Sequence, residues 1–241
     1  MIIGGLEKLT LLDYPDHLAA VIFTQGCNFR CHFCYNPMLV LPLKGEDKKN
    51  KKEKGFSPLS PKNLFLFLSQ RFGRLEGVVI TGGEPTLHPD LPFFIKKIKS
   101  IGYLVKLDTN GTNPEMLAGL IKDKLIDYIA MDLKAPLAKY RAVVGAPVDC
   151  KNIRKSVKMI IKSGLPYEFR TTVVPGLLAK GDFEAMGRVI KGAQKWYLQN
   201  FKSDTGLVDS SFETKPGYTA KEMAEFAAIG KKYVDLCQVR G

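Results

Sequence analysis

Short apolar runs alternate with longer helical patterns along most of the chain. The runs are rich in β-branched and aromatic residues and have polar residues or glycine at their ends, which is typical of strands. Six strands are predicted in this way: 19–24, 77–81, 103–108, 127–133, 167–174 and 196–201. Strands separated by helix-length segments indicate repeated βα units with parallel pairing. We therefore predict an α/β fold, a partial (β/α)6 TIM-like barrel of parallel strands.

The segments between the strands carry helix signals. Pro61 and Pro114 follow Ser60 and Asn113, the order expected where a helix begins, and Gly102 stands where one ends. One apolar stripe, of the kind that packs a helix on a sheet, consists of Ile153, Val157, Ile160 and Ile161.

The chain is predicted to be a single domain, residues 1–241, because it shows neither an internal repeat nor a Gly/Ser-rich linker. The core is expected to span about residues 10–205. Residues 202–241, with the amphipathic stretch TAKEMAEFAAIGKKYV, are expected to form a C-terminal helical extension. The low-complexity run KGEDKKNKKEK, residues 44–54, is predicted as a basic surface loop.

The net charge of +12 raises the question of a nucleic-acid partner. Part of this charge lies in the run 44–54, and the remaining lysines are scattered over the predicted solvent faces of helices. The charge therefore gives little support to nucleic-acid binding, and it suits an acidic protein such as a small electron carrier equally well.

The cellular compartment is predicted from three features: the length of the apolar runs, the first residues of the chain and the cysteines. The longest apolar runs, such as 18–23, are far too short to span a membrane. The start, MIIGGLEKLTLLDYPD, does not have the pattern of a signal peptide. Five cysteines, three of them clustered, fit a reduced cytoplasmic protein.

Four unusual motifs each stand at the end of a predicted strand. CNFRCHFC (27–34) follows the first strand, TGGEPT (81–86) the second and DTNG (108–111) the third, and MDLK (131–134) ends the fourth. In a parallel β/α barrel the carboxyl ends of the strands share one face, and the loops there build the active site. We therefore expect the four motifs to belong to an active site.

Cys27, Cys31 and Cys34 place three thiols within eight residues. Thiolates are soft ligands that suit an iron–sulfur cluster or zinc. A four-iron cluster normally takes four cysteines, so three would leave one iron open to a substrate or cofactor. His32 is a candidate fourth zinc ligand, but it adjoins Cys31 in the sequence. The pattern favours a cluster, with zinc as the alternative.

The other cysteines and the histidines do not suggest a second centre. Cys150 and Cys237 are isolated, and a free cysteine most often packs as a small buried residue. Two such residues are too few for an auxiliary cluster. His17, His32 and His88 form no recognisable triad or zinc set and are predicted as turn or surface residues.

The cysteine motif resembles the CxxxCxφC signature of the radical S-adenosylmethionine (SAM) enzymes, with Phe33 as the aromatic residue φ. The resemblance implies that the three cysteines bind one 4Fe-4S cluster, whose fourth iron is chelated by the amino and carboxylate groups of SAM. It also implies that Phe33 lies near the adenine. GGEP resembles the family segment whose backbone meets the methionine amino group, which assigns this role to Gly82 and Gly83, with Glu84 supporting the loop.

DTNG and MDLK, together with FRTTVVP (169–175), resemble the glycyl-radical-enzyme activators within this family. In the activators, oxygen ligands from the first two motifs help to bind a monovalent cation near SAM, and such ligands suit a hard cation. The basic residues of the DLK and FRTTVVP stretches, which approach SAM in the activators, are Lys134 and Arg170 here. The positions implied for the cation site are Asp108, Thr109 and Asp132, with the adjoining Asn110 and the carbonyl of Ala130.

Several stretches, among them LTLLDYPDHLAAVIFTQGCNFRC and YIAMDLKAP, are similar to the activating proteins of anaerobic ribonucleoside-triphosphate reductase. The pyruvate formate-lyase activators carry a glycine- and proline-rich stretch where this chain has DYPDHL, which favours the reductase branch. The resemblance implies a cytoplasmic enzyme of anaerobic metabolism that cleaves SAM to a 5′-deoxyadenosyl radical. That radical would generate a glycyl radical on a partner enzyme. The implied partners are this glycyl radical enzyme and an electron donor such as flavodoxin or ferredoxin.

Other functions remain open. A radical SAM enzyme that acts on a small molecule, of the 7-deazapurine-precursor type, shares the cysteine loop and GGEP. An activator of the pyruvate formate-lyase type shares DTNG and DLK as well. A zinc-stabilised nucleic-acid-binding protein would use the basic charge, but it leaves the four strand-end motifs unexplained, and the chain lacks a second cysteine pair for a zinc ribbon.

Overall fold

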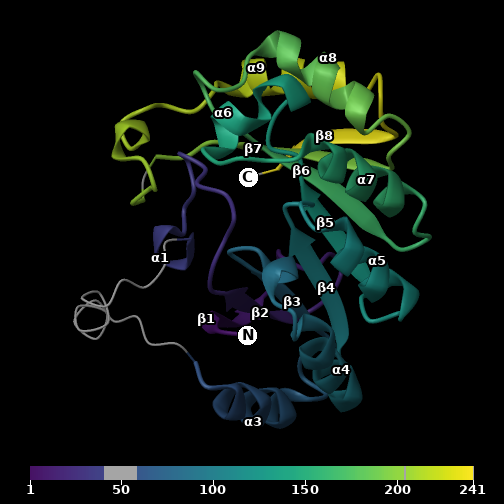
Figure 1. The fold of residues 1–241 in the computed structure, drawn as a ribbon. Helices are drawn as coiled ribbons and strands as arrows, with labels where there is room; N and C mark the ends of the chain where they lie inside the picture. The colour runs from purple at the N-terminus through teal and green to yellow at the C-terminus, as the bar shows by residue number, and fades with distance from the viewer. Residues whose placement is uncertain (41–58, 204, 241) are drawn as a thin grey trace. The chain divides into compact units, whose positions relative to one another are not determined.

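The computed structural model of the chain describes residues 1–40, 59–203 and 205–240, and the predicted basic loop 44–54 lies outside these residues. The strands are β1 (Ile3–Thr10), β2 (Ala19–Thr24), β3 (Gly77–Gly82), β4 (Leu104–Thr109), β5 (Tyr128–Asp132), β6 (Tyr167–Val173), β7 (Lys195–Asn200) and β8 (Leu236–Arg240) (Figure 1). The helices are α1 (Pro37–Val40), α3 (Pro61–Arg71), α4 (Leu91–Ile101), α5 (Pro114–Lys122), α6 (Tyr140–Val144), α7 (Cys150–Ile161), α8 (Lys180–Val189) and α9 (Ala220–Gly230).

The six predicted strands are present as β2 to β7, with each end within one residue of the predicted position. β2 pairs with β3, β3 with β4, β5 with β6, and β6 with β7, all in parallel. The strands follow one another in the sheet in chain order, and helices separate the consecutive parallel strands. The predicted α/β fold of parallel strands, with the strand order of a partial TIM-like barrel, is confirmed.

Two strands were not predicted, and they are the first and last in the sheet order. β1 pairs antiparallel with β2, and β8 pairs parallel with β7. The sequence of β1, IGGLEKLT, has two glycines and exposed charged residues, and β8 has five residues, of which only Cys237 is buried. Short, half-exposed strands carry too few apolar residues for periodicity to reveal them. The segment 202–241 therefore contains a helix, α9, and also a strand.

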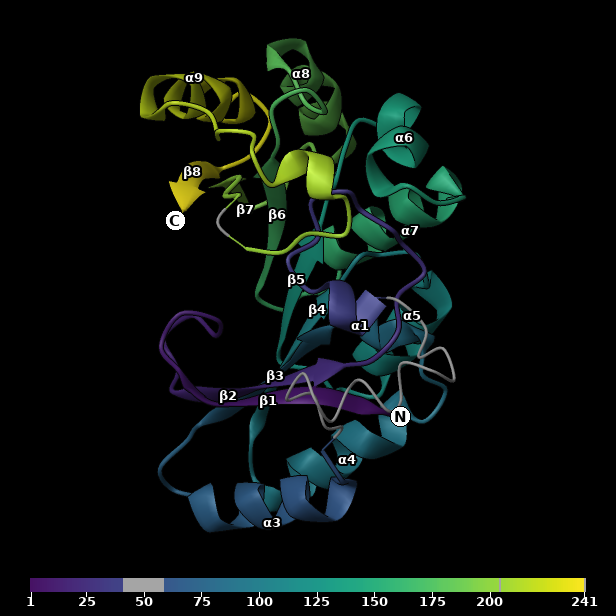
Figure 2. The ribbon, with the colours of Figure 1, turned by 90° about the vertical axis from the view of Figure 1, so that its left-hand side faces the viewer.

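The chain divides into two compact units. The first comprises residues 1–28, 38–108 and 118–128. Residues 19–22 of β2 and 78–80 of β3 are buried, as expected for parallel strands covered on both faces. α3 and α4 pack side by side (Figure 2), and α4 ends at Gly102 in the left-handed conformation, with a φ of 111°.

The second unit comprises residues 29–37, 109–117 and 129–241. α8 packs against α9, where the rings of Phe183 and Phe226 stack with their centroids 4.6 Å apart, and α9 also packs on β7 and β8. Within the described parts of the chain, no helix has the length and apolar content needed to cross a membrane. The predicted stripe of α7 is buried at Ile153, Val157 and Ile160.

Candidate active site

The ends of β2 and β3 lie side by side in the first unit. Thr24 pairs with Gly82 at the last position of both strands, and the Gly83 N–H donates to the Thr24 carbonyl at 2.9 Å. Gly82 has a φ of 116°, which glycine adopts without strain. A Cβ on Gly83 would lie 1.9 Å from the carbonyl oxygen of Gly26. The two glycines therefore allow the GGEP loop to contact the chain immediately before Cys27.

Glu84 closes the same loop from within. Its side chain is buried, and Oε1 accepts hydrogen bonds from the Thr86 N–H at 3.1 Å and the Thr86 hydroxyl at 2.6 Å. The Glu84 N–H donates to the Gly26 carbonyl at 2.8 Å. The carboxylate thus stabilises the turn that carries GGEP.

Much of the cysteine motif belongs to the second unit. Cys31 and Phe33 are buried, and the Cys34 N–H donates to the Cys31 carbonyl at 3.1 Å. Cys34 and Cys27, the latter in the first unit, are partly exposed, and none of the three cysteines forms a disulfide. Among the described residues, no three His, Cys, Asp or Glu side chains are gathered as ligands of one metal ion. Three cysteines at this spacing, none of them in a disulfide, nevertheless have the soft donor chemistry that an iron–sulfur cluster requires.

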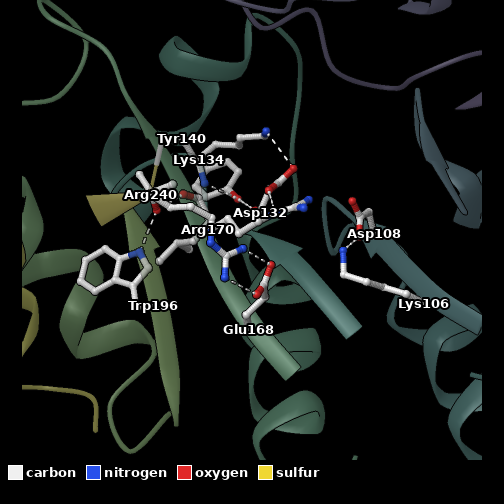
Figure 3. Close-up of polar contacts among 11 residues, drawn as sticks. Lys106, Asp108, Asp132, Lys134, Tyr140, Glu168, Arg170, Trp196 and Arg240 are labelled. Carbon is white, nitrogen blue, oxygen red and sulfur yellow. Dashed lines mark hydrogen bonds and ion pairs between the residues drawn. The ribbon is translucent and has the colours of Figure 1, made fainter. Parts of the chain in front are cut away.

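Asp132, the last residue of β5, holds two basic side chains (Figure 3). It lies opposite Arg170 of β6 in the strand register. Arg170 Nε donates to Asp132 Oδ1 at 3.0 Å, and Lys134 Nζ donates to Oδ2 at 3.1 Å. Burial favours the neutral carboxyl, but Arg170 and Lys134 outweigh this effect and lower the pKa of Asp132 to about 2. The structure therefore brings together the basic residues of the MDLK and FRTTVVP motifs.

Lys134 also connects this cluster with the cysteine motif. Its ammonium lies 6.0 Å from the centroid of the Phe33 ring. Burial lowers the pKa of Lys134, but the Asp132 carboxylate and the nearby Cys31 thiolate raise it above its ordinary value. Tyr140, which no sequence pattern indicated, is buried next to this cluster. Its hydroxyl accepts from the Lys134 N–H at 3.2 Å and donates to the Asp132 carbonyl at 3.4 Å. The second unit thus places a lysine ammonium beside one predicted cluster ligand.

Thr109 and Asn110 close the turn of the DTNG motif with their own side chains. Thr109 Oγ1 accepts from the Gly111 N–H at 3.1 Å. Asn110 Oδ1 accepts from the Thr112 N–H at 3.0 Å and from the Thr112 hydroxyl at 2.7 Å. Ser156 of α7 donates to the Gly111 carbonyl at 2.8 Å. Sequence reasoning missed Ser156, although a serine next to the apolar stripe of a helix is a signal for such a buried contact.

Asp108, the last residue but one of β4, lies in the first unit and is paired with Lys106 (Figure 3). Lys106 Nζ donates to Asp108 Oδ1 at 2.5 Å, and the lysine side chain is only 1% exposed. Sequence reasoning also missed Lys106. The signal was a lysine between apolar residues in the strand LVKLDT, because a lysine is almost never fully buried unless it is paired.

His32 and Tyr35 connect the cysteine motif with the segment after β7. His32 Nδ1 lies 3.0 Å from Asp209 Oδ2, and its ring stacks on Phe212 with the centroids 5.7 Å apart. The Tyr35 hydroxyl accepts from the Lys202 N–H at 2.9 Å. His32 was predicted only as a turn or surface residue, and these partners were missed because they are distant in the sequence.

Most of these motifs lie within the part of the chain that matches a known protein family. The model of the radical SAM superfamily matches residues 21–185, which include the cysteine motif, GGEP, DTNG and MDLK. The chain belongs to the radical SAM superfamily. Members of this superfamily use a 4Fe-4S cluster and SAM, and the three cysteines of the motif, which form no disulfide, fit such a cluster.

The relatives of this radical SAM enzyme differ in the share of its sequence that aligns with theirs. It is 35% identical to the "Putative glycyl-radical enzyme activating enzyme MJ1227" of Methanocaldococcus jannaschii, over 99% of this chain and 95% of the relative. It is 34% identical to the "Probable GTP 3',8-cyclase" of Sulfolobus acidocaldarius, over 68% of this chain and 49% of the relative. It is 35% identical to the 7-carboxy-7-deazaguanine synthase of Aquifex aeolicus, over 36% of this chain and 34% of the relative.

Solved structures share the fold of this radical SAM enzyme. Streptococcus suis SuiB bound to its precursor peptide SuiA gives a TM-score of 0.65 at 15% identity, over 92% of this chain and 48% of SuiB. A domain of a pyruvate-formate lyase-activating enzyme from Bacteroides vulgatus gives 0.53 at 18% identity, over 69% of this chain and 99% of that domain. At these identities the likeness concerns the fold alone.

Proposed function

We propose that this radical SAM enzyme activates a glycyl radical enzyme, and that its partner is an anaerobic ribonucleoside-triphosphate reductase. In the proposed reaction, one electron cleaves SAM to methionine and a 5′-deoxyadenosyl radical. The radical then removes a hydrogen atom from the α-carbon of a glycine in the partner, leaving a glycyl radical and 5′-deoxyadenosine.

The observation that carries the proposal is the cluster of Asp132, Lys134 and Arg170 beside Cys31 and Phe33. The DLK and FRTTVVP residues distinguish the activators from other radical SAM enzymes that share the cysteine motif. The relative whose name states glycyl-radical enzyme activation, and which matches 99% of this chain, supports the same assignment.

In this proposal Cys27, Cys31 and Cys34 hold one 4Fe-4S cluster, and Phe33 lies near the adenine. The bound cluster supplies the electron for SAM cleavage, which is chemistry that the side chains lack. The burial of Cys31 and Phe33 keeps water from the place where a reactive radical would form.

Lys134 and Arg170 are proposed to bind the carboxylate of SAM. Their side chains are 17% and 15% exposed, so charge-assisted hydrogen bonds from them are little weakened by solvent. Asp132 holds both basic groups in place before SAM arrives. Gly82 and Gly83 present backbone without a side chain to the methionine amino group.

The proposed electron donor is a flavodoxin or ferredoxin. These carriers are small proteins, and an acidic carrier would be attracted by the net charge of +12. Lysines exposed on α7, such as Lys151, Lys155 and Lys158, contribute to this charge.

The test is anaerobic electron paramagnetic resonance of reconstituted enzyme mixed with reductant, SAM and the anaerobic ribonucleotide reductase of the same genome. A glycyl-radical doublet is expected, together with release of 5′-deoxyadenosine. Release of 5′-deoxyadenosine without the doublet would contradict the proposed partner. If protein that holds a full cluster gives neither the doublet nor 5′-deoxyadenosine, this result would contradict SAM cleavage itself.

A small-molecule radical SAM reaction is the second candidate. It is favoured by the partial matches to the named GTP cyclase and deazaguanine synthase, at 34% and 35% identity. In that case the 5′-deoxyadenosine released without the reductase would increase on adding GTP or a purine precursor. The activase proposal expects no such increase.

A further inference from the structure

Lys106 is a buried cation that the proposed function has not used. Its side chain is 1% exposed in the apolar strand β4, and its ammonium lies 2.5 Å from Asp108 Oδ1 and 5.9 Å from the centroid of the Tyr128 ring. Burying an ammonium is costly unless a carboxylate compensates it. Asp108, the first residue of the expected cation site, is therefore already paired with a positive charge, the Lys106 ammonium.

The second expected carboxylate of that site also has basic partners within its own unit. Asp132 accepts hydrogen bonds from Lys134 Nζ at 3.1 Å and from Arg170 Nε at 3.0 Å. A monovalent cation beside Asp108 would have to approach a buried ammonium, and like charges a few ångström apart repel strongly where water is scarce. The residues present therefore do not fit the monovalent cation that the resemblance implies.

We infer that the Lys106 ammonium takes the place of this monovalent cation, so that the chain works without potassium or sodium. A lysine ammonium is a compact point charge, as a bound potassium ion is. Lys106 acts through Asp108 and is a positioning residue. The inference rests on the proposed cleavage of SAM, because the cation site is expected beside SAM.

The first test measures SAM cleavage by the reconstituted wild-type enzyme with photoreduced deazaflavin as the reductant and choline as the only added cation. The expected rate lies within about twofold of the rate with potassium. Lys106→Met leaves Asp108 without its ammonium and is expected to lose more than about tenfold in choline, a change of about 1.4 kcal/mol, and to recover with potassium. Lys99→Met, which breaks the Lys99–Asp127 ion pair of the same unit, is the matched control and should not respond to potassium.

A second readout needs no cluster. The melting temperature of the cluster-free Lys106→Met protein should rise with potassium relative to choline, whereas the wild type and Lys106→Met/Asp108→Asn should not respond. A wild-type enzyme that cleaves SAM only with potassium would overturn the inference. This measurement remains decisive even where the Lys106→Met variant does not fold. A Lys106→Met variant that ignores potassium in both readouts would overturn it as well. Absence of SAM cleavage in every wild-type sample would refute the proposed function instead. The melting temperatures would then decide whether Lys106 takes the place of the cation.

Discussion

The Lys134 ammonium lies 6.0 Å from the centroid of the Phe33 ring. These two residues come from motifs about a hundred positions apart, and the same lysine also contacts Asp132 at 3.1 Å. A cation over an aromatic face is attracted to it, by roughly 0.5–1 kcal/mol at exposed sites and more when desolvated. This relationship places a basic group of the MDLK motif directly beside the cysteine motif.

Replacing Lys134 should weaken SAM binding. A charge-assisted hydrogen bond contributes about 1.5–3 kcal/mol, so Lys134→Met is expected to raise the KM for SAM roughly 10- to 100-fold. Lys139→Met is the matched control, because this lysine pairs with Asp182 and is 51% exposed. An unchanged KM in Lys134→Met would show that this ammonium does not reach SAM.

Removing Cys31 should abolish cluster binding and SAM cleavage together, because two thiolates cannot hold the cluster. The measurements are the iron content after reconstitution and the release of 5′-deoxyadenosine from Cys31→Ala. Cys150→Ala serves as the control, since Cys150 stands apart at the first residue of α7. Full iron and full activity in Cys31→Ala would refute the ligand assignment.

Adding a methyl group to Gly83 should disturb the GGEP loop, because the new Cβ would lie 1.9 Å from the Gly26 carbonyl oxygen. Overpacking of this kind costs about 1–3 kcal/mol, which denaturant unfolding of the cluster-free Gly83→Ala protein can measure. Gly119→Ala is the control: this helical glycine of α5 has no neighbour within 4 Å of the added Cβ, and the change should stabilise the chain by about 0.5–1 kcal/mol. Equal effects of the two substitutions would contradict this account of Gly83.

Truncating Phe212 should loosen the cysteine motif, because its ring stacks on His32. In the sequence, His32 lies between Cys31 and Phe33. An aromatic pair contributes about 0.5–1.5 kcal/mol, so iron loss from Phe212→Ala to a chelator should be roughly two- to tenfold faster. The Phe212 ring lies under Lys215 Nζ at 3.6 Å. Phe93→Ala is the control, because Phe93 of α4 likewise lies under a lysine, Lys97, at 4.5 Å, but its ring is exposed. Identical rates in the two variants would argue against a link between Phe212 and the cluster.

Stability at high pH should depend on Cys237. Burial of this thiol raises its pKa from 9.0 to about 12. The native state therefore keeps the thiol protonated where the unfolded chain loses the proton, so the contribution is complete below about pH 9 and is lost as the pH rises toward about 12. The free energy of unfolding should fall by about 1.4 kcal/mol per pH unit in that interval relative to Cys237→Ala. Parallel pH profiles of the two proteins in urea unfolding would contradict the burial effect.

Local spacing alone determined most of the fold. Parallel strands that are covered on both faces are continuous apolar runs, and the intervening helices carry their own start and stop residues, so β2 to β7 could be located within one residue. Such signals extend over a few neighbouring residues. β1 and β8 lack them because their stability comes from pairing with β2 and β7 rather than from their own composition.

The sequence also indicated which chemistry the chain performs, because three cysteines at x3 and x2 spacing on a strand-exit loop predict cluster ligands without reference to the rest of the fold. The partners of charged groups were decided only by the tertiary structure. That Lys106 faces Asp108, that Arg170 lies opposite Asp132, and that His32 meets Asp209 follows from strand register and from loops folding back on one another. Ion pairs and ring contacts depend on distances in space, and a linear pattern does not contain those distances.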